Sequence, residues 1–231
     1  MPNKNIIKFG LIALGLSLLI FVIFIFRGKK DNQTQVEPTP TPKLVEIELN
    51  QRPHISLIPR ADGHELKLNI KDITDEIRSV EYELIYNAQD EGLEIEKGLS
   101  GMADIDSSSI EKDLLLGTAS CTNSCKYKYD EDITGGSLNI SFTTKNNQIA
   151  LYNTAFVLSS TPQVKKDGLT LDDFVLRATP SQNEFFILLK NYNQNYSVFS
   201  SGTGKGTVQS VSPGFSSQDQ TKIATDYLVN E

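Results

Sequence analysis

The strongest constraint in this sequence is an apolar run close to its start, residues 6–26. Sixteen of these 21 residues are Leu, Ile, Val or Phe, and Lys8 carries the only charge. A helix of this length, at ~1.5 Å per residue, spans about 31 Å and matches the ~30 Å hydrocarbon core of a bilayer. Lys8 lies near one end, where its ammonium reaches the headgroups. We predict one transmembrane helix, with residues 1–27 as a membrane anchor.

The residues that follow the run favour a retained anchor over a cleaved signal peptide. A cleavage site needs small residues, whereas here Phe24, Ile25 and Phe26 lead directly into Arg27. Cations flank the run about equally on both sides, so the positive-inside rule does not choose an orientation. A Pro/Thr-rich segment and a cysteine pair follow, and both suit an oxidising exterior. We therefore expect a single-pass protein of the cell membrane with an extracytoplasmic C-terminal domain.

Residues 28–43 form the predicted stalk. Pro38, Pro40 and Pro42 alternate with threonine, a composition that favours the extended and solvated polyproline II conformation. At ~3.1 Å per residue, such a segment holds a domain as much as about 50 Å from the bilayer.

From residue 44 onward, apolar and polar residues alternate with the period of a β-strand. The clearest segments are 45–49, 66–70, 80–86, 138–142 and 150–158. Turn-forming residues separate them, and no long helical period occurs. This pattern predicts an all-β ectodomain, an immunoglobulin-like antiparallel sandwich over residues 44–160.

Residues 161–231 follow a predicted connector and contain five further candidate strands. The segment 185–189 is continuously apolar, which is typical of a strand that is covered on both faces. We expect this part to be either a second small β-rich module or an extension of the sandwich.

Cys121 and Cys125 are the only cysteines, and three residues separate them. Such a pair closes a small disulfide loop when its Cα atoms come within about 7 Å. We expect this disulfide, with free thiols as the alternative. A zinc site would need two further ligands, and no spacing brings His54 or His64 to the pair. We predict no cofactor and no metal site.

The order of anchor, stalk and alternating strands resembles membrane-anchored bacterial surface proteins that carry an immunoglobulin-like or fibronectin type III-like β-sandwich. The resemblance is carried by residues 78–86, RSVEYELIY, and by residues 114–125, LLLGTASCTNSC. It implies binding or display at the cell surface, and it supplies no catalytic residues.

An enzymatic alternative is a membrane-anchored, sortase-like cysteine transpeptidase that uses Cys121 as nucleophile and His64 as base. Such chemistry also needs an arginine to stabilise an oxyanion. Only Lys126 and Lys128 follow the cysteine closely, and lysine lacks the guanidinium fork. The segment 117–121 also departs from the Thr-Leu-x-Thr-Cys pattern of such enzymes.

Charge limits the class of ligand. Five of the 22 cations and none of the 29 acidic residues lie in the first 30 positions, which leaves a net charge of −12 on the rest. A domain this acidic repels phosphate backbones, so we expect no nucleic-acid partner. The acid pairs Asp104/Asp106 and Asp130/Asp132 have the hardness that calcium prefers but lack its loop pattern.

Two Asn-x-Ser triplets, at Asn139 and Asn195, match the glycosylation sequon. Taken together, the sequence predicts a non-enzymatic binding, adhesion or envelope-assembly module with a protein or glycan ligand. A subunit of a larger membrane complex is a further alternative.

Overall fold

The computed structural model describes residues 42–231, except positions 91, 106, 213, 217, 218, 230 and 231. The predicted all-β class is confirmed for this part of the chain, because its strands pair in antiparallel sheets and it contains a single short α-helix. The strands and the helix are β1 His54–Pro59, β2 Glu65–Lys71, β3 Ile77–Asp90, β4 Leu93–Asp104, β5 Ile110–Leu115, β6 Gly117–Cys121, β7 Cys125–Tyr129, β8 Gly135–Thr144, β9 Ile149–Ser160, α2 Thr161–Asp167, β10 Leu169–Leu171, β11 Phe174–Pro180, β12 Phe185–Lys190, β13 Tyr196–Ser200, β14 Gly206–Ser212, β15 Phe215–Ser216 and β16 Asp226–Val229.

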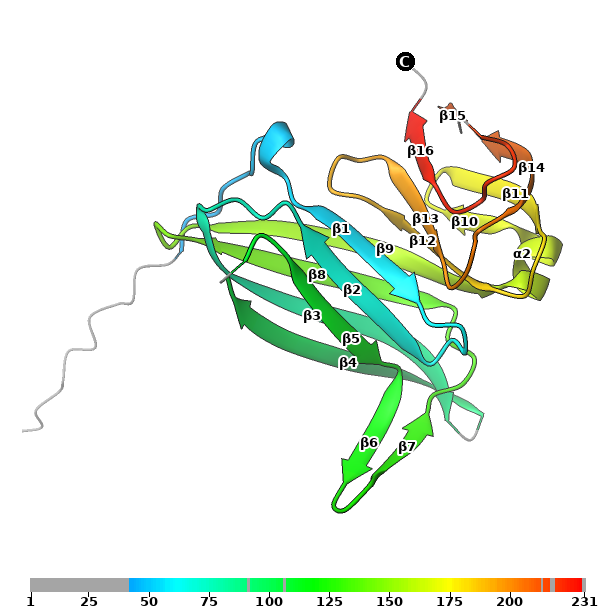
Figure 1. The fold of residues 1–231 in the computed structure, drawn as a ribbon, viewed down its shortest axis with the longest axis horizontal. Coiled ribbons are helices and arrows are strands. Elements are labelled where there is room, and N and C mark those ends of the chain that lie inside the picture. Colours follow the sequence, from blue (N-terminus) through cyan, green and yellow to red (C-terminus); the bar gives the residue numbers. More distant parts are fainter. Residues whose placement is uncertain (1–41, 91, 106, 213, 217–218, 230–231) are drawn as a thin grey trace, which may run out of the picture. The chain divides into compact units, whose positions relative to one another are not determined.

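The largest sheet has eight strands in the order β15-β16-β13-β12-β9-β8-β3-β4. It therefore joins strands from before and after residue 160 in one ladder. The junction is the antiparallel pairing of β12 with β9, which runs from Phe185 opposite Ser160 to Leu189 opposite Phe156. Figure 1 shows this sheet passing through the whole described body.

One face of the large sheet is covered by the three-stranded sheet β1-β2-β5 (Figure 1). The two sheets share one set of buried side chains, here called the first core. Alternate residues of each strand enter it, because successive side chains of a strand point to opposite faces. Val80 and Leu84 of β3 and Leu66 and Leu68 of β2 are all fully buried there.

A second core lies against the C-terminal strands of the large sheet and is closed by helix α2 and by the sheet β10-β11-β14. Phe174 lies at its centre, with its ring 4.8 Å from that of Tyr196 and 5.3 Å from that of Tyr227. Helix α2 contributes Val164. The helix begins where the Gln163 side-chain oxygen accepts a hydrogen bond from the backbone N–H of Ser160 at 2.6 Å.

Strand β12 belongs to both cores. Ile187 and Leu189 point into the first core, whereas Phe186 and Leu188 point into the second, and all four are 0% exposed. The continuously apolar segment 185–189 is therefore covered on both faces, as its composition predicts.

One local prediction is wrong: residues 45–49 form no strand, because Leu44 makes a single bridge to Ile149 and a 3₁₀-helix spans Leu49–Gln51. The predicted connector after residue 160 contains helix α2, which links β9 to β10. Among the described residues no helix is long and apolar enough to cross a membrane. The predicted transmembrane helix and the stalk up to residue 41 lie outside the described residues.

A buried carboxylate holds the loop that follows β13. Glu184, 6% exposed, accepts hydrogen bonds from the Ser200 hydroxyl at 2.7 Å, the Thr203 N–H at 2.9 Å and the Gly204 N–H at 2.9 Å. Burial alone would raise the pKa of Glu184, but these donors outweigh it and lower the pKa below its usual range.

This carboxylate makes stability depend on pH. Since the pKa of Glu184 is lower in the folded than in the unfolded chain, its contribution is complete above the unfolded value of ~4.3 and is lost as the pH falls through the folded value. We predict that Glu184→Gln lowers the free energy of unfolding by about 1–3 kcal/mol at neutral pH. Urea unfolding between neutral and acid pH should show this difference shrinking below the unfolded pKa. The control Glu81→Gln changes an exposed residue and should leave the free energy of unfolding unchanged. A difference between Glu184→Gln and the unmodified chain that stays constant at every pH would contradict the assignment.

The double burial of β12 gives a second prediction. Leu188→Ala and Leu189→Ala open cavities in different cores, and each should lower the free energy of unfolding by about 2–5 kcal/mol. Leu93 is 70% exposed and serves as the matched control. Leu93→Ala should change the free energy of unfolding by less than about 0.5 kcal/mol. If only one of the two core variants were destabilised in chemical denaturation, β12 would not support both cores.

Candidate functional site

Strands β6 and β7 form a two-stranded sheet of their own, here called the projecting hairpin, residues 117–129. Every residue from 118 to 129 is exposed. Figure 1 shows the hairpin extending away from the sheets on either side of the first core. A long exposed hairpin contributes nothing to a core, so other contacts must hold it in an ordered conformation.

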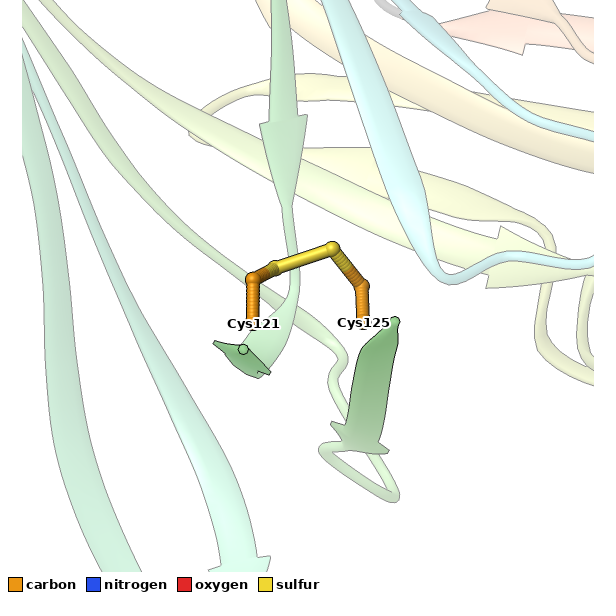
Figure 2. Close-up of a disulfide and its surroundings, with 2 residues drawn as sticks. All are labelled: Cys121 and Cys125. Atoms are coloured by element: carbon orange, nitrogen blue, oxygen red, sulfur yellow. A yellow bond between two sulfur atoms is a disulfide. The ribbon is translucent and has the colours of Figure 1, made fainter. Parts of the chain in front are cut away.

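The first support is the predicted disulfide, which is present. Cys121 and Cys125 are directly paired across the two strands and joined by an S–S bond, with Cα atoms 4.1 Å apart (Figure 2). No described cysteine is free. An isolated two-stranded hairpin is marginally stable in water, and the bond closes this one at its turn.

The second support is at the root. Leu116 and Asp130, the residues on either side of the hairpin, are both buried. The Asp130 N–H donates to the Leu116 carbonyl oxygen at 3.1 Å. The Asp130 carboxylate accepts a hydrogen bond from the Tyr86 hydroxyl of β3 at 2.8 Å and pairs with Lys97 of β4. Asp130 thus fixes one end of the hairpin to the large sheet, whereas the other end continues from β5 of the three-stranded sheet.

The pKa of Tyr86 reflects the burial of the hairpin root. Burial, and then the adjacent Asp130 carboxylate, raise the pKa of Tyr86 well above its ordinary value. The hydroxyl therefore stays protonated and remains a hydrogen-bond donor to Asp130 across the physiological pH range.

Gly117 allows the chain to turn from β5 into the hairpin. Its φ is +151°, and a Cβ at this position would lie 2.3 Å from the Lys128 carbonyl oxygen. Any side chain here would separate β6 from β7, so the close approach of the strands requires glycine.

Period-two alternation gives the hairpin two different faces. On one face Tyr127 lies opposite Ala119 and Tyr129 lies opposite Gly117. On the other face Ser120 lies opposite Lys126 and Thr118 lies opposite Lys128. One face is aromatic over small partners, and the other is hydroxyl-rich and cationic.

The aromatic face is an ordered row of three parallel rings, here called the aromatic row. His64, which precedes β2, stacks on Tyr129 at 4.1 Å and 11°, and Tyr129 lies parallel to Tyr127 at 6.0 Å and 5°. Tyr127 and Tyr129 are 53% and 38% exposed. Tyrosine combines a large apolar surface, few rotamers and a polar hydroxyl, which is why it is enriched in binding interfaces.

One of the two histidines lies beside the hairpin that contains Cys121 and Cys125. His64 lies at the root beside Tyr129, whereas His54 is the exposed first residue of β1. The sulfur that a cysteine enzyme would need, that of Cys121, is bonded to Cys125.

The acid pairs have separate roles. Asp130 is buried in the hairpin root, Asp132 is exposed, and Asp104 ends β4, while Asp106 lies outside the described residues. Over the described ranges no three His, Cys, Asp or Glu side chains gather as metal ligands. Of the two sequon residues, Asn139 lies in β8 and donates to Glu83 at 3.0 Å, and Asn195 precedes β13.

Sequence reasoning missed Tyr127 and Tyr129. The pattern that carries them is Lys-Tyr-Lys-Tyr over residues 126–129, directly after the second cysteine. Its alternation predicts a strand, although its apolar members are aromatic residues that no core covers.

No family model, no curated protein and no solved structure matches this chain.

The disulfide yields a local prediction. Replacing both cysteines, Cys121→Ser with Cys125→Ser, removes a constraint worth about 2 kcal/mol for so short a loop. We expect residues 117–129 to lose amide protection in hydrogen exchange, because no other sheet supports them, while the large sheet keeps its protection. Ser124→Ala, in the same turn, is the control. Loss of protection throughout the first core would show that the hairpin is part of the cooperative fold.

Proposed function

We propose that this chain is a binding or adhesion module displayed outside the cytoplasm from a single-pass membrane anchor, residues 6–26. Its described part consists of packed antiparallel sheets, which fits an immunoglobulin-like sandwich. The sequence contains no tryptophan, and its disulfide is local instead of joining two sheets. We therefore propose a divergent member of the sandwich class.

The projecting hairpin is the observation that carries this proposal. It exposes twelve consecutive residues, its tip is closed by a disulfide and its root is fixed by buried Asp130. Fixing a contact surface before binding lowers the entropic cost of association. A rigid projecting element with exposed tyrosines is suited to a protein partner, which it contacts through the aromatic row.

Display outside the cell rests on three features. The apolar run has the length of a membrane span, and the Pro/Thr-rich stalk separates it from the domain. Disulfides persist in oxidising compartments and are rare in the cytosol, so Cys121–Cys125 fits an exterior location.

A protease added to intact cells tests the display. We predict that it removes the domain from residue 44 onward while leaving a cytosolic control protein intact. A domain that resists digestion until the cells are lysed would contradict extracytoplasmic display.

A photo-crosslinker tests the hairpin separately. With p-benzoylphenylalanine in place of Tyr127, irradiation of the native host should produce a discrete crosslinked product. The same group in place of Leu228, a 45% exposed residue of β16, is the control. Equal products from both positions would contradict a role for the hairpin, and a product confined to Leu228 would place the partner elsewhere.

A further inference from the structure

Strand β9 has a gap in its pairing at the edge that faces β12. At one end of the gap, the Ile149 N–H donates to the Lys43 carbonyl oxygen at 3.0 Å, and the Ile149 carbonyl accepts from the Val45 N–H at 2.9 Å. At the other end, β12 pairs with β9 only from Phe156 onward. Figure 1 shows β9 continuing well past the end of β12.

The backbone groups in the gap have a defined direction. Ile149 bonds toward this edge, whereas the Gln148 carbonyl accepts from the Thr144 N–H of β8 at 2.9 Å. Since the hydrogen-bonding direction alternates along a strand, the N–H and C=O groups of Leu151 and Asn153 also point into the gap. Within the described residues, no hydrogen bond is found to these four groups.

A cavity of about 630 Å³ lies against this open edge. Its walls are the Leu44–Glu46 segment on one side and Tyr192 with Gln194 on the other, and Leu151 forms part of its floor. Leu44 and Leu151 are 66% and 43% exposed, which leaves an apolar rim uncovered. Residues 150–155 span about 20 Å at ~3.4 Å per residue, the length of a five- to six-residue strand.

Arg52 fixes the width of the cavity. Its guanidinium donates to the Ile47 carbonyl oxygen at 3.0 Å and to the Tyr192 carbonyl oxygen at 2.8 Å, and lies 4.9 Å from the centre of the Tyr192 ring. It also pairs with Glu46 at 2.5 Å. The arginine thus joins both walls and is fully engaged, while the Glu46 side chain is 82% exposed at the rim.

We propose that this cavity, the β9 slot, binds an extended segment of a partner protein that adds a short strand to β9. The segment's backbone pairs with Leu151 and Asn153, as in other cases of β-augmentation. An apolar side chain covers Leu44 and Leu151, and a neighbouring Lys or Arg faces Glu46. A cationic segment fits the excess of 29 acidic over 22 basic residues in the chain. The slot is separate from the projecting hairpin, and its proposal does not depend on membrane display.

The test uses the full 231-residue chain in detergent and a defined probe, the peptide acetyl-Thr-Lys-Val-Thr-Val-Lys-Thr-amide. We expect the peptide to slow hydrogen exchange at the amides of Leu151 and Asn153 and to leave the amides of the projecting hairpin unchanged. The same peptide N-methylated on its three central residues keeps its side chains but loses its ladder donors, and it should bind at least about tenfold more weakly.

Asn153→Pro is the matching change in the protein. The substitution removes an N–H that faces the slot. It keeps every N–H of β9 that bonds to β8, so the strand can still form. We expect it to weaken peptide binding about tenfold or more, whereas Asn153→Thr, which keeps the N–H, binds as the unmodified chain does. Exchange at Leu151 is measured in the unmodified chain, so the test stands even if the proline variant does not fold.

Three outcomes would overturn the proposal. One is no added protection of Leu151 and Asn153 at about 1 mM peptide. Another is equal binding of the methylated peptide, which would show that the side chains alone are recognised. The third is protection that rises with protein concentration in the absence of peptide, which would assign the slot to a second copy of this chain.

Discussion

The fold depends on the burial of one strand from both sides. Ile187 and Leu189 of β12 complete the first core, and Phe186 and Leu188 complete the second. Burying four such side chains is worth roughly 6–12 kcal/mol, comparable to the entire net stability of a typical domain. Strand β12 also provides the only sheet pairing that joins β9 to β13 within the described chain. Neither core is complete without it.

This arrangement explains where the surface features occur. The projecting hairpin and the β9 slot both lie where pairing with a neighbouring strand of the main sheets ends. The hairpin begins where Leu116 ends the run of β5, and Asp130 returns the chain to the large sheet through Tyr86 and Lys97. The slot exists because β12 stops at Lys190 while β9 starts seven residues before their pairing begins.

Sequence patterns predicted many of the strands that contribute to a core, but not β1, whose Ile55 and Leu57 are buried in the first core. Alternation located β2, β3, β8 and β9, and the apolar run at 185–189 predicted a doubly covered strand. Each of these segments has a hydrophobic face because that face is buried. Alternation in the sequence therefore reveals a strand only where one face of that strand is buried.

The same reasoning explains the failures. Strands β6 and β7 cover nothing, so Thr118, Ser120 and the two tyrosines carry no core pattern. Asp130 has the sequence context of a solvated loop acid, and only the tertiary fold buries it against Tyr86. The pairing of β12 with β9 follows from contacts between segments that no local pattern specifies. The disulfide was predictable because Cys121 and Cys125 are close in sequence. The aromatic row was not, because it includes His64, which lies far from Tyr127 and Tyr129 in the sequence.

The shared strand is tested most directly by ending the chain at residue 160, which removes β12 and the second core. When urea unfolding is monitored by tyrosine fluorescence, the complete chain should show one cooperative transition. The shortened chain should show no cooperative transition, since Phe156 and Leu158 lose the strand that completes their core. A shortened chain that unfolds cooperatively at the midpoint of the complete chain would show that the first core is independent, and would contradict this account.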